Sequence, residues 1–95
     1  MRIRKIDANQ NKIVKTLRQV PGVSVLSIAA IGHGCPDIMV GIYGNTYLYE
    51  IKDPKQPPSG RKLTVDEINF KAAWHGHYKV ITTVQEILRD IRITK

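Results

Sequence analysis

The chain has 95 residues, with 15 lysines and arginines against 8 aspartates and glutamates, which gives a formal net charge of +7. A chain of this length makes one small domain, residues 1–95, and its positive charge favours a polyanion such as nucleic acid as partner. No apolar run approaches the roughly 20 residues that cross a bilayer, and the basic N-terminus does not lead into the apolar core of a signal peptide. We therefore expect a cytoplasmic protein with no membrane partner.

The first predicted element is a helix over residues 6–19. Asp7 is a good N-cap, and Gln10, three residues later, completes an Asp-x-x-Gln capping box. Pro21 and Gly22 end the helix. Apolar residues recur at the spacing of one helical face. The stripe that we expect to be buried consists of Ile13, Val14 and Leu17.

Residues 23–31 are mostly apolar and predict a strand that is buried on at least one face. Gly32, His33 and Gly34 follow as a flexible loop. His33 either contacts a phosphate or faces water, and the sequence leaves both interpretations open.

The stretch from Gly34 to Lys52 predicts two strands joined by a tight turn. Both runs are rich in β-branched, aromatic and aliphatic residues, and Gly44-Asn45 between them tolerates positive φ. Side chains alternate across a strand, so Glu50 and Lys52 share a face with roughly 6.6 Å between their Cα atoms. The register that the turn implies brings Asp37 close to Glu50.

These side chains suit a hard divalent cation. Mg²⁺ takes oxygen ligands, typically one or two carboxylates together with water and phosphate oxygens. Asp37, Glu50 and the backbone carbonyl of Ile51 are the candidate ligands. Lys52 is placed to orient or deprotonate the attacking water and to neutralise charge on the phosphate. The expected chemistry is metal-assisted phosphodiester hydrolysis.

A proline-rich loop follows over residues 53–62, where three prolines and a glycine exclude regular structure. Its polar side chains either position DNA through phosphate contacts that do not read sequence, or form a solvated surface. The candidate phosphate-binding residues of this loop are Lys55, Ser59, Arg61 and Lys62.

The C-terminal third predicts a helix, a short strand and a last helix. Thr64 and Glu67 form a capping box that opens a helix ending near Trp74, whose indole either belongs to the core or stacks a base. Residues 78–81 predict a strand, and residues 83–86 cap the last helix. The side chains that we expect these two helices to bury are Ile68, Ala72, Ala73, Ile87, Leu88 and Ile91. The order of elements predicts an α/β fold, a small mixed β-sheet flanked by helices.

Pro36-Asp37 followed by Glu50-Ile51-Lys52 resembles the signature of the PD-(D/E)XK nucleases. The chain is more narrowly similar to the small stand-alone VRR-NUC proteins, through segments that cover nearly its whole length. The matching segments are residues 7–10, 34–41, 50–53, 57–59, Arg61 and 63–64. The resemblance implies a restriction-endonuclease-like core and a Mg²⁺- or Mn²⁺-dependent endodeoxyribonuclease.

The same resemblance implies structure-selective cleavage of DNA, with four-way (Holliday) junctions favoured and flaps or other branches as the alternative. It also implies that a residue of the first helix completes the catalytic site, with Gln10 as one match and Asp7 as a possible fourth acid. Two nicks related by a two-fold axis require two sites, so we expect a homodimer. Its candidate surfaces are the first strand with its neighbouring helix, or Tyr43, Tyr47 and Tyr49.

Two other classes of function remain open on the sequence. In a nucleic-acid-binding module, the acids and Lys52 would form only an ion pair at a strand end. In a structural protein, the fold alone would matter. An active site further requires that the carboxylates are not consumed by internal salt bridges, and that their crowding raises a carboxylate pKa.

Overall fold

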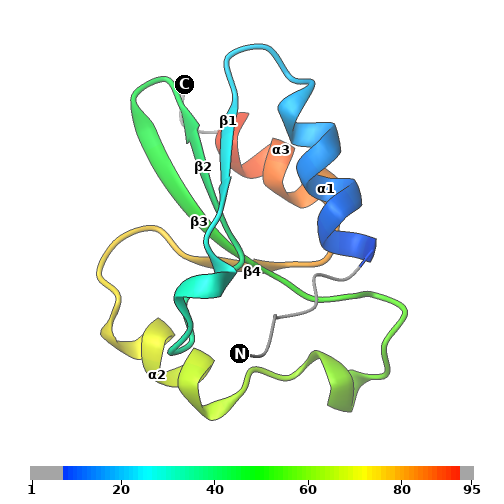
Figure 1. Ribbon diagram of the computed structural model, residues 1–95, viewed down its shortest axis with the longest axis vertical. Coiled ribbons are helices and arrows are strands. Elements are labelled where there is room, and N and C mark those ends of the chain that lie inside the picture. Colours follow the sequence, from blue (N-terminus) through cyan, green and yellow to red (C-terminus); the bar gives the residue numbers. More distant parts are fainter. Residues whose placement is uncertain (1–7, 93–95) are drawn as a thin grey trace.

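The computed structural model describes residues 8–92 and is built on a mixed sheet whose strands lie in the order β1-β2-β3-β4 (Figure 1). The strands are β1 Ser24–Ser27, β2 Ile38–Ile42, β3 Asn45–Ile51 and β4 Lys79–Ile81. The first three pair antiparallel, and β4 pairs parallel to β3. This confirms the predicted α/β class with a small mixed sheet.

Three α-helices accompany the sheet within the described residues: α1 Ala8–Arg18, α2 Val65–Ala73 and α3 Val84–Arg92. The helices α1 and α3 contact each other on one side of the sheet, whereas α2 lies apart from them, near the opposite end of the molecule (Figure 1). Asp7, the predicted N-cap of the first helix, lies outside the described residues. No helix within residues 8–92 is long and apolar enough to cross a bilayer.

The hydrophobic core fills the space between the sheet and the pair α1 and α3. The predicted stripe of α1 is buried, as are Ile87 and Ile91 of α3, while Leu88 is partly buried against the core. The strands contribute the side chains of one face of the sheet. These buried residues are Val25, Ile38, Val40, Ile42, Tyr47, Tyr49, Ile51 and Ile81. Tyr47 and Tyr49 are therefore core residues and offer no surface to a second copy of the chain.

The hairpin forms as predicted, with Ile38 opposite Tyr49 and Ile42 opposite Asn45. Its two-residue turn is one position earlier than expected. Tyr43 and Gly44 have φ of 54° and 78°, and Asn45 already belongs to β3. A tight turn with both central residues at positive φ matches the right-handed twist of the flanking strands.

The first strand is shorter than predicted. Instead of one strand over residues 23–31, β1 ends at Ser27, and Ala29–Ile31 form a 3₁₀ turn, η1. The amide of Ile28 still donates to the carbonyl of Asp37 at 2.9 Å, but its ψ of 5° turns the chain out of the sheet. Only Val25 of this strand is buried, because β1 is an edge strand whose other side chains face outward.

The proline-rich loop also contains a turn that the sequence did not suggest. Pro58–Arg61 form a second 3₁₀ turn, η2, with the amide of Gly60 donating to the carbonyl of Pro57 at 2.8 Å. Proline at the start of the turn lacks an amide hydrogen that would have no intrahelical acceptor there, and its fixed φ suits the turn. Proline content therefore did not exclude regular structure here.

The orientation of α2 was predicted incorrectly. Ile68 is 52% exposed, Ala72 and Ala73 are exposed, and Glu67 is the buried residue of this helix. Trp74 is 45% exposed and stacks on Phe70, so it is not a core residue. The helix turns its polar Glu67 inward because this carboxylate binds Lys52, directly after β3. The apolar residues of the helix are therefore turned toward solvent.

Candidate active site

Asp37 and Glu50 face each other across the hairpin, as the sequence predicted. Asp37 directly precedes Ile38, whose partner Tyr49 directly precedes Glu50. The hydrogen-bonded pairing of the two strands extends to this point, because the amide of Asp37 donates to the carbonyl of Tyr49 at 3.1 Å. Asp37 Oδ2 also accepts a hydrogen bond from the amide of Ile51 at 2.8 Å. Both carboxylates are thus held by the strands and are buried, with relative exposures of 5% and 2%.

Lys52 lies between two carboxylates. Its Nζ is 3.4 Å from Glu50 Oε2, which confirms that these side chains share one face of the strand end. The same Nζ donates to Glu67 Oε1 at 2.9 Å, a contact that the sequence did not predict. The requirement that the carboxylates stay outside internal salt bridges is therefore met only in part, with Glu67 holding the lysine more closely than Glu50.

Glu67 reaches this position because it closes a capping box. Thr64 Oγ1 accepts from the amide of Glu67, and Glu67 Oε1 accepts from the amide of Thr64 at 2.9 Å. The predicted capping box is confirmed, but the carboxylate has a second role because it also binds Lys52. The proline-rich loop leaves the sheet at Lys52 and returns at Thr64, so one carboxylate binds both of its ends.

The side chains of Asp37, Glu50, Lys52 and Glu67 form a carboxylate cluster, in which neighbouring charges shift pKa values. Burial, followed by the negative charges of Asp37 and Glu67, raises the pKa of Glu50 to about 8, against an ordinary value of 4.5. For Glu67, burial opposes ionisation, yet the hydrogen bonds from Thr64 and Lys52 lower its pKa. Burial also disfavours the charged form of Lys52, but its carboxylate partners, Glu67 first, raise the pKa of the ammonium. The predicted rise of a carboxylate pKa is thus found at Glu50.

The glycine loop packs against the start of α2. Gly32, His33 and Gly34 all have positive φ, from 57° to 80°. A Cβ atom on Gly34 would clash with the backbone carbonyl of Asp66 in the first turn of α2. Glycine is thus needed here for close packing of the loop against the helix that carries Glu67. His33 itself is exposed, and the structure gives it no contact with the carboxylates.

The oxygen atoms of Asp37, Glu50 and the Ile51 carbonyl are suitable ligands for Mg²⁺, but they do not fill its coordination shell. Within the described residues, no group of three or more Asp, Glu, His or Cys side chains is arranged to hold a metal ion. Mg²⁺ nevertheless keeps several waters and takes only one or two carboxylates from a protein. Glu50 Oε1 is buried and has no hydrogen-bond partner among the described residues. A cation beside Asp37 and Glu50 would occupy that oxygen and relieve the repulsion between the carboxylates.

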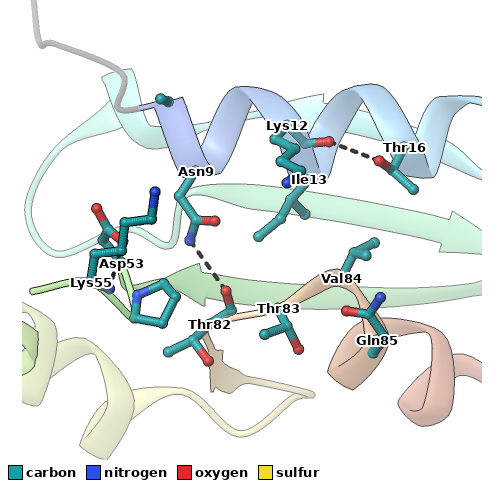
Figure 2. Close-up of a pocket in the computed structure, with 12 residues that line it drawn as sticks. Asn9, Lys12, Ile13, Thr16, Asp53, Lys55, Thr82, Thr83, Val84 and Gln85 are labelled. Carbon is teal, nitrogen blue, oxygen red and sulfur yellow. Dashed lines mark hydrogen bonds between the residues drawn. The ribbon is translucent and has the colours of Figure 1, made fainter.

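The start of α1 abuts the strand end that carries Lys52. The side-chain amide of Asn9 donates to the carbonyls of Lys52 and Thr82 at 3.1 Å and 3.2 Å, and Figure 2 shows the second of these bonds. Gln10, the next residue, is buried in α1 at 5% exposure. A cavity of about 370 Å³ opens beside Asn9 between α1, the start of the proline-rich loop and the start of α3 (Figure 2). Lys12 and Lys55 line it together with Asp53.

Three of the four candidate phosphate-binding residues of the proline-rich loop lie on the surface. Lys55, Ser59 and Lys62 are exposed, and Arg61 is half-buried. Arg61 Nε is buried without a hydrogen-bond partner among residues 8–92. The structure brings Asp37, Glu50, Ile51 and Lys52 together. Within residues 8–92 it gives no hydrogen bond or ion pair between this group and Lys55, Arg61 or Lys62.

Sequence reasoning missed two residues of the site, Glu67 and Tyr78. The capping-box pattern already explained why a glutamate stands at position 67. Nothing else in the sequence indicated that Glu67 also binds Lys52. Tyr78 precedes a short strand and belongs to no motif. The parallel pairing of β3 with β4, which sets Glu50 opposite Val80, was the feature needed to place Tyr78 near the carboxylates.

Fold and site together define a small mixed α/β domain with three buried carboxylates, two of which pair with one lysine. No family model matches the chain, and no curated protein or solved structure matches it significantly.

Proposed function

We propose that this chain is a Mg²⁺- or Mn²⁺-dependent endodeoxyribonuclease with a restriction-endonuclease-like core. The observation that carries the proposal is the arrangement of Asp37 and Glu50, which face each other across the hairpin with Lys52 Nζ 3.4 Å from Glu50. Buried carboxylates cost stability unless they are paired or bind a cation. The net charge of +7 suits a DNA substrate.

In the proposed mechanism, Asp37, Glu50 and the carbonyl of Ile51 would hold the cation. When bound, it would supply Lewis-acid chemistry for phosphodiester hydrolysis. Lys52 orients the attacking water and offsets the charge that develops on the phosphate. Glu67 holds Lys52 in place through the hydrogen bond of 2.9 Å. Gln10 is the residue of α1 proposed to complete the site, and Asp7 is the alternative from the segment before it.

The proposed substrate is branched DNA, with four-way junctions favoured. Lys55, Ser59, Arg61 and Lys62, with His33, are proposed to contact phosphates and not base edges, so that shape and charge select the substrate. Two symmetric nicks require two sites, and we propose a homodimer. The exposed apolar residues available for its interface are Leu26, Ile31, Tyr43, Val65, Ile68 and Trp74.

A panel of labelled DNAs tests the proposal. The purified protein is incubated with a four-way junction, a flap, a duplex and a single strand, with and without Mg²⁺ or Mn²⁺. We expect cleavage only with metal, and paired symmetric nicks in the junction. Asp66→Asn, an exposed acid next to the site, is the matched control and should cut normally. Equal cleavage of flaps and junctions would reject junction selectivity but not the nuclease.

One observation favours a second function. Lys52 is already paired with Glu67 at 2.9 Å, as expected for an ion pair that only stabilises a nucleic-acid-binding module. In that case the wild-type protein binds the same DNAs but cuts none of them under either metal. Light scattering at micromolar protein tests the dimer separately.

A further inference from the structure

Tyr78 packs against Phe70 of α2, the helix that carries Glu67. It lies directly before β4, and its hydroxyl oxygen is buried without a hydrogen-bond partner among the described residues. Buried hydroxyl groups in native proteins nearly always have a partner, so an exception calls for a reason. The surroundings of this hydroxyl indicate what that reason is.

Two observations place Tyr78 on the same side of the sheet as the carboxylates. In the parallel pair, Glu50 lies opposite Val80, and side chains two positions apart along a strand share a face. Tyr78 thus continues the face of Glu50 and Lys52. Its ring also packs against Phe70 of α2, with 5.7 Å between centroids. Phe70 lies three residues after Glu67, hence on the same side of that helix.

The protonation state of Tyr78 makes it a hydrogen-bond donor. Burial, followed by the charges of Glu50, Glu67 and Asp37, raises the pKa of Tyr78 to about 12, so the phenol keeps its proton at neutral pH. Glu50 Oε1, in the same cluster, is a buried acceptor that likewise has no hydrogen-bond partner within residues 8–92. One donor and one acceptor, each without a partner, thus lie in the same group of side chains.

We propose that Tyr78 is a positioning residue of the candidate active site, whose hydroxyl donates a hydrogen bond to Glu50 through one bridging water. This bond fixes the orientation of the Glu50 carboxylate toward the cation. The inference rests on the proposed function, because the orientation of Glu50 matters only if it binds a cation. Partners of metal ligands typically change metal affinity or activity by about 10- to 100-fold when they are removed.

The test is Tyr78→Phe, which removes the hydroxyl and keeps the ring against Phe70. We expect the affinity for Mn²⁺, measured by calorimetry on the full chain, to fall about tenfold or more. The KM for DNA should stay unchanged and kcat at a fixed Mn²⁺ concentration should fall, because the buried hydroxyl does not touch DNA. Tyr43→Phe is the matched control for metal binding, since that ring is 70% exposed at the hairpin turn, and it should leave the affinity for Mn²⁺ unchanged.

The outcomes separate the two proposals. If Asp37→Asn loses Mn²⁺ binding while Tyr78→Phe keeps the wild-type affinity and kcat, the role of Tyr78 is rejected and the nuclease stands. If the wild-type protein binds no Mn²⁺, both are rejected.

A second measurement does not depend on the folding of the variant. Addition of Mn²⁺ to the wild-type protein should perturb the near-ultraviolet absorption of a tyrosine, and Tyr43→Phe should keep this difference spectrum. Its absence in a wild-type protein that binds Mn²⁺ would contradict the role of Tyr78.

Discussion

The two faces of β3 differ sharply although both are buried. Tyr47, Tyr49 and Ile51 point into the apolar core under α1 and α3, whereas Leu48 and Glu50 point to the side of α2. The first face meets mostly apolar side chains, together with Asp90, which accepts a hydrogen bond from Tyr49, and the ring of His77. The second face meets Glu67, Lys52 and Asp37. Burial of apolar surface stabilises the fold, whereas buried carboxylates lower its stability. A chain of 95 residues has few side chains to bury, so a costly second face suggests a selected function.

The largest expected effect is on the polar face. Glu50→Gln, Asp37→Asn and Lys52→Ala should each reduce Mg²⁺-dependent cleavage by at least about 100-fold, as removal of a group acting in the transition state does. Glu50→Gln should keep the fold and much of the DNA affinity, because the amide has nearly the same shape. Cleavage rates and binding curves on one junction measure both properties. Normal cutting by Glu50→Gln would reject the site.

The apolar face should give the opposite result. Leu17 is fully buried in the core, so Leu17→Ala should lower the free energy of unfolding by about 2–5 kcal/mol. Denaturant unfolding measures this loss. The rate of cleavage per folded molecule should be unchanged, since the side chain lies on the other side of the sheet from the carboxylates. A large drop in that rate would show that the two faces are not independent.

The third prediction concerns the pH dependence of stability that Glu50 gives to the polar face. The pKa of Glu50 is raised to about 8 in the folded chain, against 4.5 ordinarily. Between these values the unfolded chain releases a proton that the folded chain retains, so stability should fall as pH rises through this window. The slope approaches about 1.4 kcal/mol per pH unit and vanishes above the folded pKa. Urea unfolding across the window measures it.

Glu50→Gln is the control for this pH dependence. The variant has no group that titrates at this position, so its stability should lack the slope. The lowered pKa values of Glu67, Glu86 and Asp90 act below the window and do not obscure it. A wild-type protein whose stability is level across the window would show that Glu50 is already ionised there.

The smallest expected effect concerns the loop. If Lys55, Arg61 and Lys62 contact phosphates, replacing any one by alanine should weaken binding to all DNA sequences alike. The slope of log affinity against log salt should fall by about one unit per cation. Lys15, exposed on α1, provides a matched control. A triple variant with an unchanged slope would identify the loop as solvated surface.

The relative positions of Asp37, Glu50 and Lys52 were predictable from the sequence because they depend on residues that are close together in the chain. The alternation of a strand sets Glu50 beside Lys52, and a two-residue turn sets Asp37 opposite Glu50. Neither inference needs any knowledge of distant contacts.

The misplaced features depend on tertiary contacts. The apolar spacing of Ile68 and Ala72 suggested a buried face, but the bond from Lys52 to Glu67 and the packing of Phe70 on Tyr78 turn α2 the other way. The strand predicted over residues 23–31 ends early because its partner β2 begins at Ile38, which lies opposite Ser27. The chain then leaves the sheet and forms η1.

The central claim is that the polar face binds a divalent cation through Asp37 and Glu50. Thermal unfolding with increasing Mg²⁺ tests it most directly, because a ligand that binds only the folded chain raises the melting temperature with concentration. We predict such a rise for the wild-type protein and for Asp66→Asn, and its loss in Glu50→Gln and Asp37→Asn. An equal rise in all four proteins, or none in the wild type, would contradict the account.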